Sequence, residues 1–149
     1  NGAHVAEIEL DPETGVIQVV DYTAVDDCGR VINPLLAGGQ VHGGVVQGLG
    51  QALFEHAQYD DYGQLVTGSF MDYAMPRASQ TPDIDVSFNE VLDPNNELGV
   101  KGIGEGGACG APPALVNAVI DALRSRGIEH VNMPLTSESI WRALQRSSA

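Results

Sequence analysis

The stretch GGQVHGGVVQGLGQAL, residues 38–53, predicts the helix around which we expect the rest of the chain to fold. From Leu36 to about Gln58 the apolar residues recur at ~100° per residue, which predicts a helix with one broad apolar face. That face comprises Val41, Val45, Leu49, Ala52 and Leu53. Uncharged residues occupy the opposite face, namely Gln40, Gly44, Gln47 and Gln51. No charged side chain follows until Glu55, so this face is not an ordinary solvated surface.

Two interpretations of the amide and glycine face stay open. Glycine costs roughly 1 kcal/mol per helical position relative to alanine, so several glycines need a compensating reason. A helix buried on both sides, whose amides bind a polar ligand, is one explanation. Tight helix packing, with the amides bound to nearby backbone, is the other.

An α+β fold is expected around this helix, with an N-terminal β-hairpin, short strands and two C-terminal helices. Alternation over residues 5–10, turn residues at 11–15 and a β-branched run at 16–25 predict the hairpin. Residues 65–72, 84–88 and 130–133 are predicted to be extended. Proline-containing segments make a subdomain break near 60–83 possible.

The two C-terminal helices are predicted from their boundary residues. Pro112 and Pro113 suit the first turn of a helix, where their missing N–H groups cost nothing. Gly127 is expected to end that helix, and Thr136 to cap the last one.

A single carboxylate, Glu105, lies among glycines in the loop Gly102–Ala108. An acid that no neighbouring side chain shields is typical of a positioned general base. A glutamate that only faces water on a glycine-rich surface turn is an equal alternative. The loop also matches G-x-G-x-x-G, but a dinucleotide site is rejected because the carboxylate would repel a pyrophosphate.

Composition excludes several functions. A formal net charge of -13, with seven scattered Lys and Arg, argues against nucleic acid as a partner. Cys28 and Cys109 lack zinc-ligand spacing, so no metal ligands and a reduced, cytoplasmic setting are expected. No transmembrane segment or targeting signal is visible in these residues.

Five motifs in register closely resemble the C-terminal part of the molybdopterin-binding large subunit of the xanthine dehydrogenase, aldehyde oxidase and aerobic carbon monoxide dehydrogenase family. The motifs are VDDCGRVINP at 25–34, GQVHGGVVQGLGQAL at 39–53, FMDYAMP at 70–76, GVKGIGE at 99–105 and APPALVNAV at 111–119. Together they are spread over residues 25–119 of the chain. The resemblance implies that residues 1–149 are a C-terminal piece of a molybdopterin-binding domain.

The resemblance also implies a function and its cofactors. The family oxidises aldehydes, N-heterocycles or carbon monoxide with a molybdenum-bearing molybdopterin, usually the cytosine dinucleotide in bacteria. Electrons leave through iron–sulfur clusters and FAD in partner domains or subunits. Glu105 matches the catalytic glutamate, and Gln40 matches a pterin contact. The further cofactor-binding residues expected are Gly104, Gly102, Lys101 and Gln47, with a packing role as the alternative for Gln47 and a surface charge as the alternative for Lys101.

An alternative function is a non-catalytic scaffold or subunit-interaction module. The glycine- and serine-rich loops that hold the rest of the cofactor in the family are not found here, so the chain alone is expected to be inactive. The expected partners are the remainder of the molybdenum subunit, iron–sulfur and FAD subunits and a small-molecule substrate. Cys109 departs from the family pattern, and it is interpreted as a small buried residue or a reactive thiol.

Overall fold

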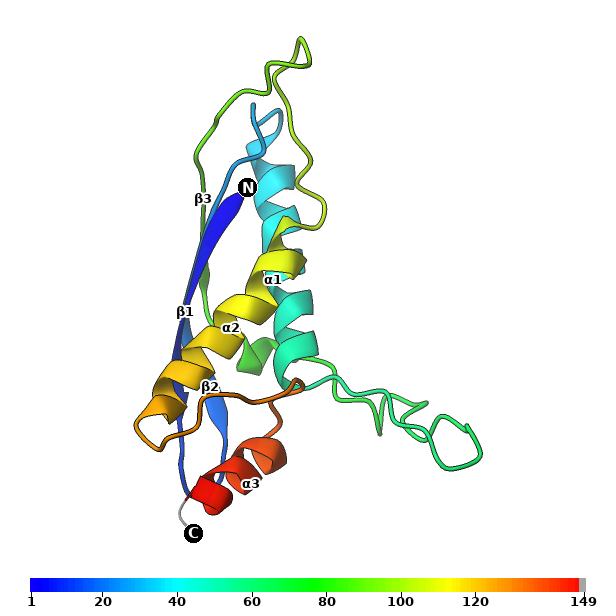
Figure 1. Ribbon diagram of the computed structural model, residues 1–149. Coiled ribbons are helices and arrows are strands. Elements are labelled where there is room, and N and C mark those ends of the chain that lie inside the picture. Colours follow the sequence, from blue (N-terminus) through cyan, green and yellow to red (C-terminus); the bar gives the residue numbers. More distant parts are fainter. Residues whose placement is uncertain (148–149) are drawn as a thin grey trace.

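The computed structural model describes residues 1–147 and contains a three-stranded sheet with helices packed against one face (Figure 1). Strands β1 (Gly2–Leu10), β2 (Ile17–Asp26) and β3 (Ile84–Phe88) lie side by side in that order. β1 pairs antiparallel with β2, whereas β3 runs parallel to β2. The predicted α+β class, the N-terminal hairpin and the strand at 84–88 are confirmed.

The hairpin turns where the sequence supplies turn residues. Gly15 has a φ of +71°, and its N–H donates to the Asp11 carbonyl at 2.8 Å. Along β1 the even-numbered side chains face the helices and are half-buried, while the odd-numbered ones are exposed. The period of two that predicted this strand therefore also determines which face the helices cover.

Helix α1 (Pro34–Leu53) begins at the Asn33 cap, whose Oδ1 accepts a hydrogen bond from the Leu36 N–H at 3.1 Å. It ends several residues before the predicted Gln58. All five predicted core residues of α1 are buried. The apolar face of α1 packs against the sheet and against helix α2 (Gly106–Arg124), and the buried side chains form two clusters. One cluster includes Leu49, Leu115 and Val119. The other includes Tyr22, Val41 and Val45.

Helices α1 and α2 (Gly106–Arg124) approach each other backbone to backbone. A Cβ added at Gly107 would lie 2.5 Å from the Val41 carbonyl oxygen, and one added at Gly44 would lie 2.9 Å from the Ala108 nitrogen. These distances are too short for any side chain. Tight helix packing, one of the two interpretations offered above, therefore explains Gly44 and also Gly48, whose Cβ would lie 2.7 Å from that of Ala111.

The predicted start of α2 is wrong. The helix begins at Gly106, so Pro112 and Pro113 lie inside it. Glycine is a poor helix former, and the sequence therefore favoured a later start at the prolines. Packing of Gly107 against α1 holds these residues helical in spite of their propensity.

Two predicted extended segments are also wrong. Residues 130–133 form no strand and are not part of the described sheet. The chain continues from there to Leu135, whose N–H donates to the Ala52 carbonyl at 2.7 Å. Residues 65–72 hold only an isolated bridge between Tyr59 and Leu65, followed by a turn at Ser69. Without a neighbouring strand, neither segment can complete a β-ladder.

The segment between α1 and β3 projects away from the body of the molecule, and the short 3₁₀ helix η1 (Ala78–Gln80) lies near its return (Figure 1). A subdomain break near 60–83 stays a prediction. The last helix, α3 (Ser137–Ser147), follows Thr136, whose Oγ1 accepts a hydrogen bond from the Ser139 N–H at 3.3 Å. The predicted cap is thus confirmed. None of the helices within residues 1–147 is long and apolar enough to cross a bilayer.

Candidate functional site

Glu105 occupies the N-cap position of α2, directly before its first helical residue. Its side chain is exposed and does not cap the helix. Its backbone carbonyl accepts the first helical hydrogen bond, from the Cys109 N–H at 2.9 Å. Within residues 1–147 the carboxylate has no hydrogen bond or ion pair, so both oxygens are available to a group from outside this chain. The positive end of the α2 dipole favours a negative charge at this position.

Gln40 lies beside the Glu105 loop although 65 positions separate the two residues in sequence. Its side-chain Nε2 donates a 2.7 Å hydrogen bond to the carbonyl oxygen of Gly104, the residue before Glu105. The contact joins the exposed start of α1 to the loop before α2. Two residues that the sequence analysis placed in separate motifs therefore belong to one surface.

Several glycines near Gln40 and Glu105 in the chain have no conformational or packing reason within it. Of the 18 glycines, five combine an ordinary negative φ with open space where a Cβ would stand. They are Gly38, Gly39, Gly43, Gly102 and Gly104. All five lie in the first half of α1 or in the Glu105 loop. A surface that lacks side chains for no internal reason suits the close approach of another group.

Lys101 is directed away from this surface and toward the end of β2. Its ammonium forms an ion pair with Asp27 Oδ2 at 2.5 Å, and the lysine side chain is one-quarter exposed. The Lys101 ammonium and backbone N–H donors lower the pKa of the Asp27 carboxyl to about 2. Lys101 was expected to bind cofactor, but the structure shows its charge paired with Asp27.

A second polar group lies beneath the start of α2. The His4 Nδ1 is 2.8 Å from the Tyr22 hydroxyl, and its Nε2 is 3.4 Å from the Asp26 carboxylate. Burial, together with the Asp26 charge, raises the pKa of Tyr22. Asp26 Oδ2 is buried without a hydrogen-bond partner among the described residues. It borders a cavity of about 280 Å³ that Gly102, Ile103, Gly106 and Cys109 also line.

The remaining predicted residues are exposed. Gln47 lies two helical turns after Gln40 on α1, and its side chain is exposed, as is that of Gln51. The described chain therefore does not bury the amide face of α1. Cys109 is exposed, so its interpretation as a small buried residue is wrong, whereas Cys28 is buried. Burial raises the pKa of the Cys28 thiol.

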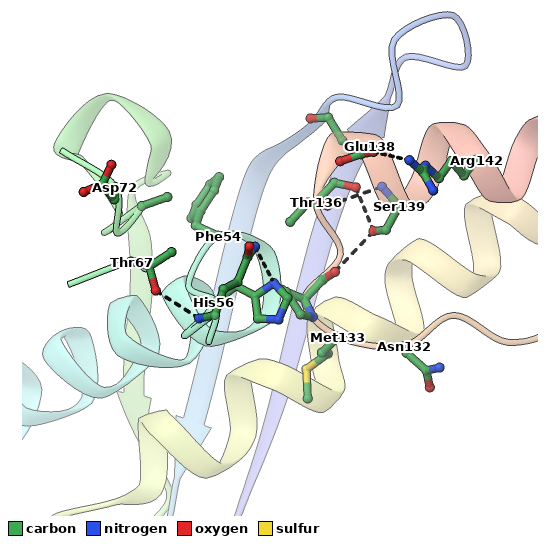
Figure 2. Close-up of a pocket in the computed structure, with 14 residues that line it drawn as sticks. Phe54, His56, Thr67, Asp72, Asn132, Met133, Thr136, Glu138, Ser139 and Arg142 are labelled. Carbon is green, nitrogen blue, oxygen red and sulfur yellow. Dashed lines mark hydrogen bonds and ion pairs between the residues drawn. The ribbon is translucent and has the colours of Figure 1, made fainter. Parts of the chain in front are cut away.

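A cavity of about 700 Å³ lies between the end of α1 and the start of α3 (Figure 2). Its labelled residues include Phe54 and His56 after α1 and Ser139 and Arg142 on α3. The charged group of Arg142 is paired with Glu138 at 2.6 Å. None of the predicted site residues lines this cavity, so its size does not make it the functional site.

Sequence reasoning missed Asp26, Asp27 and His4. Asp26 and Asp27 entered the sequence analysis only as part of the motif at 25–34, yet both are buried. Aspartate is seldom buried unless it is paired, but the sequence alone does not show that these two are buried. Among residues 1–147, no group of three or more His, Cys, Asp and Glu side chains could hold a metal ion.

Comparison with known proteins shows that this chain belongs to an enzyme family. A family model described as "Molybdopterin cofactor-binding domain" matches residues 1–82. The nicotine 6-hydroxylase large subunit of Paenarthrobacter nicotinovorans is 44% identical over 143 residues, covering 96% of this chain and 18% of that protein. The carbon monoxide dehydrogenase large chain of Hydrogenophaga pseudoflava is 34% identical over 144 residues, 97% of this chain and 18% of the relative.

A solved structure shows the same fold. Quinoline 2-oxidoreductase from Pseudomonas putida 86 matches with a TM-score of 0.92 and 43% identity, over 95% of this chain and 18% of that one. The chain thus spans less than a fifth of the length of these proteins.

Proposed function

Since this chain belongs to the molybdopterin cofactor-binding domain family, we propose that it forms one wall of the active site in a molybdenum hydroxylase large subunit. The observation that carries the proposal is the contact of Gln40 with Gly104, which brings an amide and a free carboxylate onto one glycine-lined surface. The rest of the site belongs to the remainder of the large subunit, which the relatives possess and these 149 residues do not span.

The residues present fit a large polar cofactor. Molybdopterin offers many hydrogen-bonding groups, and amide side chains can both donate to and accept from them. Gln40 would hold the cofactor through its side-chain oxygen and its second N–H, since one N–H donates to the Gly104 carbonyl. Gly102 and Gly104 would let the cofactor approach the loop, because their missing side chains leave open space there. Gln47 would contact it further along α1.

Glu105 acts as the general base in this proposal. When bound, the molybdenum cofactor supplies the two-electron oxidation. A Glu105 carboxylate oxygen accepts a proton from the water-derived oxygen nucleophile, and the positive end of the α2 dipole stabilises the carboxylate before that transfer. The Gln40 amide keeps the base in place by holding the carbonyl one residue earlier.

The substrate class that we propose is an aromatic N-heterocycle. A nicotine hydroxylase and a quinoline oxidoreductase are 44% and 43% identical to this chain, against 34% for a carbon monoxide dehydrogenase. We further propose the cytosine dinucleotide form of the cofactor, iron–sulfur and FAD partner subunits and a cytoplasmic location. Purified parent complex assayed with quinoline, nicotine, aldehydes and carbon monoxide would test the substrate class.

Glu105→Gln in the parent large subunit, assembled with its partners, tests the proposed base. The amide is isosteric but accepts no proton, so turnover should fall by about 10² to 10⁴-fold while molybdenum content stays unchanged. Glu97→Gln is the matched control, because Glu97 is also an exposed glutamate on the chain leading to this loop. Turnover of the Glu105 variant close to that of the control would refute the role and favour a scaffold function.

A further inference from the structure

The segment that carries Glu105 is attached to the end of β2. The Lys101 N–H donates to the Cys28 carbonyl at 2.7 Å, and the Arg30 N–H donates to the Gly99 carbonyl at 2.9 Å. Gly29 permits this close pairing, because its φ is +64° and a Cβ there would lie 2.1 Å from the Gly99 oxygen. The backbone is therefore held in place up to Lys101. The next tether is the Gln40 bond to Gly104.

The Asp27 carboxylate connects the segments that form this attachment. Its Oδ1 accepts hydrogen bonds from the Gly29 N–H at 2.9 Å and the Val91 N–H at 3.1 Å. Its Oδ2 accepts from the Lys101 ammonium. One buried carboxylate thus joins the exit of β2, the segment after β3 and the start of the Glu105 loop.

We propose that the Asp27–Lys101 ion pair positions Glu105, and that Lys101 acts through Asp27 instead of contacting the cofactor. The inference rests on the proposed role of Glu105 as the base. Gly102 and Gly104 give the loop a flexible backbone, and ordering such residues costs conformational entropy. An ion pair that partly excludes water at the loop's start reduces the conformations that Glu105 samples.

The variant Asp27→Asn separates this function from the rest of the Asp27 hydrogen bonds. The Asn oxygen can still accept from the N–H groups of Gly29 and Val91, which both use Oδ1. Its amide nitrogen replaces Oδ2 and cannot accept from Lys101. The fold at the end of β2 should persist while the ion pair is lost.

The experiment uses the parent large subunit in its complex with its partner subunits. For Asp27→Asn we expect kcat to fall by about 10 to 10²-fold, as for a small misplacement of a catalytic group. KM and molybdenum content should stay within about two-fold of wild type, because such a misplacement does not remove binding contacts. Hydrogen–deuterium exchange should rise in residues 99–106 and stay unchanged in α1.

Asp11→Asn is the matched control. Asp11 Oδ1 also accepts from a backbone N–H, that of Glu13 at 2.9 Å, and Oδ2 accepts from the Thr14 hydroxyl at 2.6 Å. It lies in the β1–β2 turn, at the opposite end of the hairpin from Asp27. Its replacement should leave both kcat and exchange in residues 99–106 unchanged.

Variants of Lys101 complete the test. Lys101→Met should reproduce the loss in Asp27→Asn, and the double variant should be no worse than either single variant, since both remove one interaction. Lys101→Arg should recover part of the rate, because a guanidinium can also donate to Asp27.

The proposal is overturned if Lys101→Met loses molybdenum while Asp27→Asn behaves as wild type, because Lys101 would then contact the cofactor. Unchanged exchange in residues 99–106 would overturn it as well. Failure of the proposed base appears separately, as normal turnover in Glu105→Gln. The exchange measurement does not depend on the chemistry of Glu105.

Discussion

Replacing Gly107 with alanine should force α1 and α2 apart and release Gln40 from the loop that carries Glu105. The new Cβ would lie 2.5 Å from the Val41 oxygen and 2.7 Å from the Val45 nitrogen. Both are backbone atoms, so no side chain can rotate out of the way. Since van der Waals contact begins at roughly 3.5 Å, the helices must separate locally by about 1 Å.

This separation predicts both a loss of stability and a broken contact. Overpacking against backbone costs roughly 3 kcal/mol, and the better helix propensity of alanine returns about 1 kcal/mol, which leaves a net loss of about 2 kcal/mol. A 1 Å shift would also lengthen the 2.7 Å Gln40–Gly104 hydrogen bond beyond about 3.5 Å, where it no longer forms.

Urea unfolding of the chain would measure the stability change, with Gly43→Ala as the control. Gly43 lies in α1 next to the contact residue Gly44, but it is exposed and a Cβ there meets nothing within 4 Å, so only the propensity gain of up to about 1 kcal/mol should appear. The two variants must therefore shift the urea midpoint in opposite directions. If Gly107→Ala raised the midpoint as Gly43→Ala does, the close approach of the two helices would be refuted.

Two other predictions concern titration and thiol chemistry. Because the Lys101 ammonium and backbone donors lower the pKa of Asp27 from 3.8 to about 2, its contribution to stability is fully present above pH 4 and is lost as the pH falls toward 2. Urea midpoints between pH 5 and 2 should fall less steeply for Asp27→Asn than for wild type, and equal slopes would contradict the assignment. Ellman's reagent should label one thiol rapidly in the folded chain, because Cys109 is exposed while Cys28 is buried and its pKa is raised by burial. Cys109→Ser should abolish the rapid phase, and its persistence would show that Cys28 reacts.

Local patterns in the sequence predicted the elements whose period or turn chemistry is strong. The alternation at 5–10 and the spacing of Val41, Val45 and Leu49 gave a strand and a helix with the correct buried faces. The start of α2 could not be predicted in this way, since glycines at its first positions are helical only because α1 packs against them. Because proline suits the first turn of a helix, the start of α2 was predicted at Pro112, later than its observed start at Gly106.

The sequence singled out Glu105 and Gln40 as candidate site residues but did not predict the contact between their segments. The bond through Gly104 depends on how α1 crosses α2. Lys101 illustrates the same limit. A lone lysine beside a glycine loop suggested a cofactor contact, and its Asp27 partner lies 74 positions away in sequence. Contacts at such separations follow from tertiary packing and leave no local signal.

Anomalous diffraction at the molybdenum absorption edge, from crystals of the parent subunit with its cofactor bound, tests the central claim most directly. The account predicts an anomalous peak next to the Glu105 carboxylate, in front of the surface formed by Gln40, Gly102 and Gly104. A peak remote from that surface, with the Glu105 side chain in bulk solvent, would contradict it.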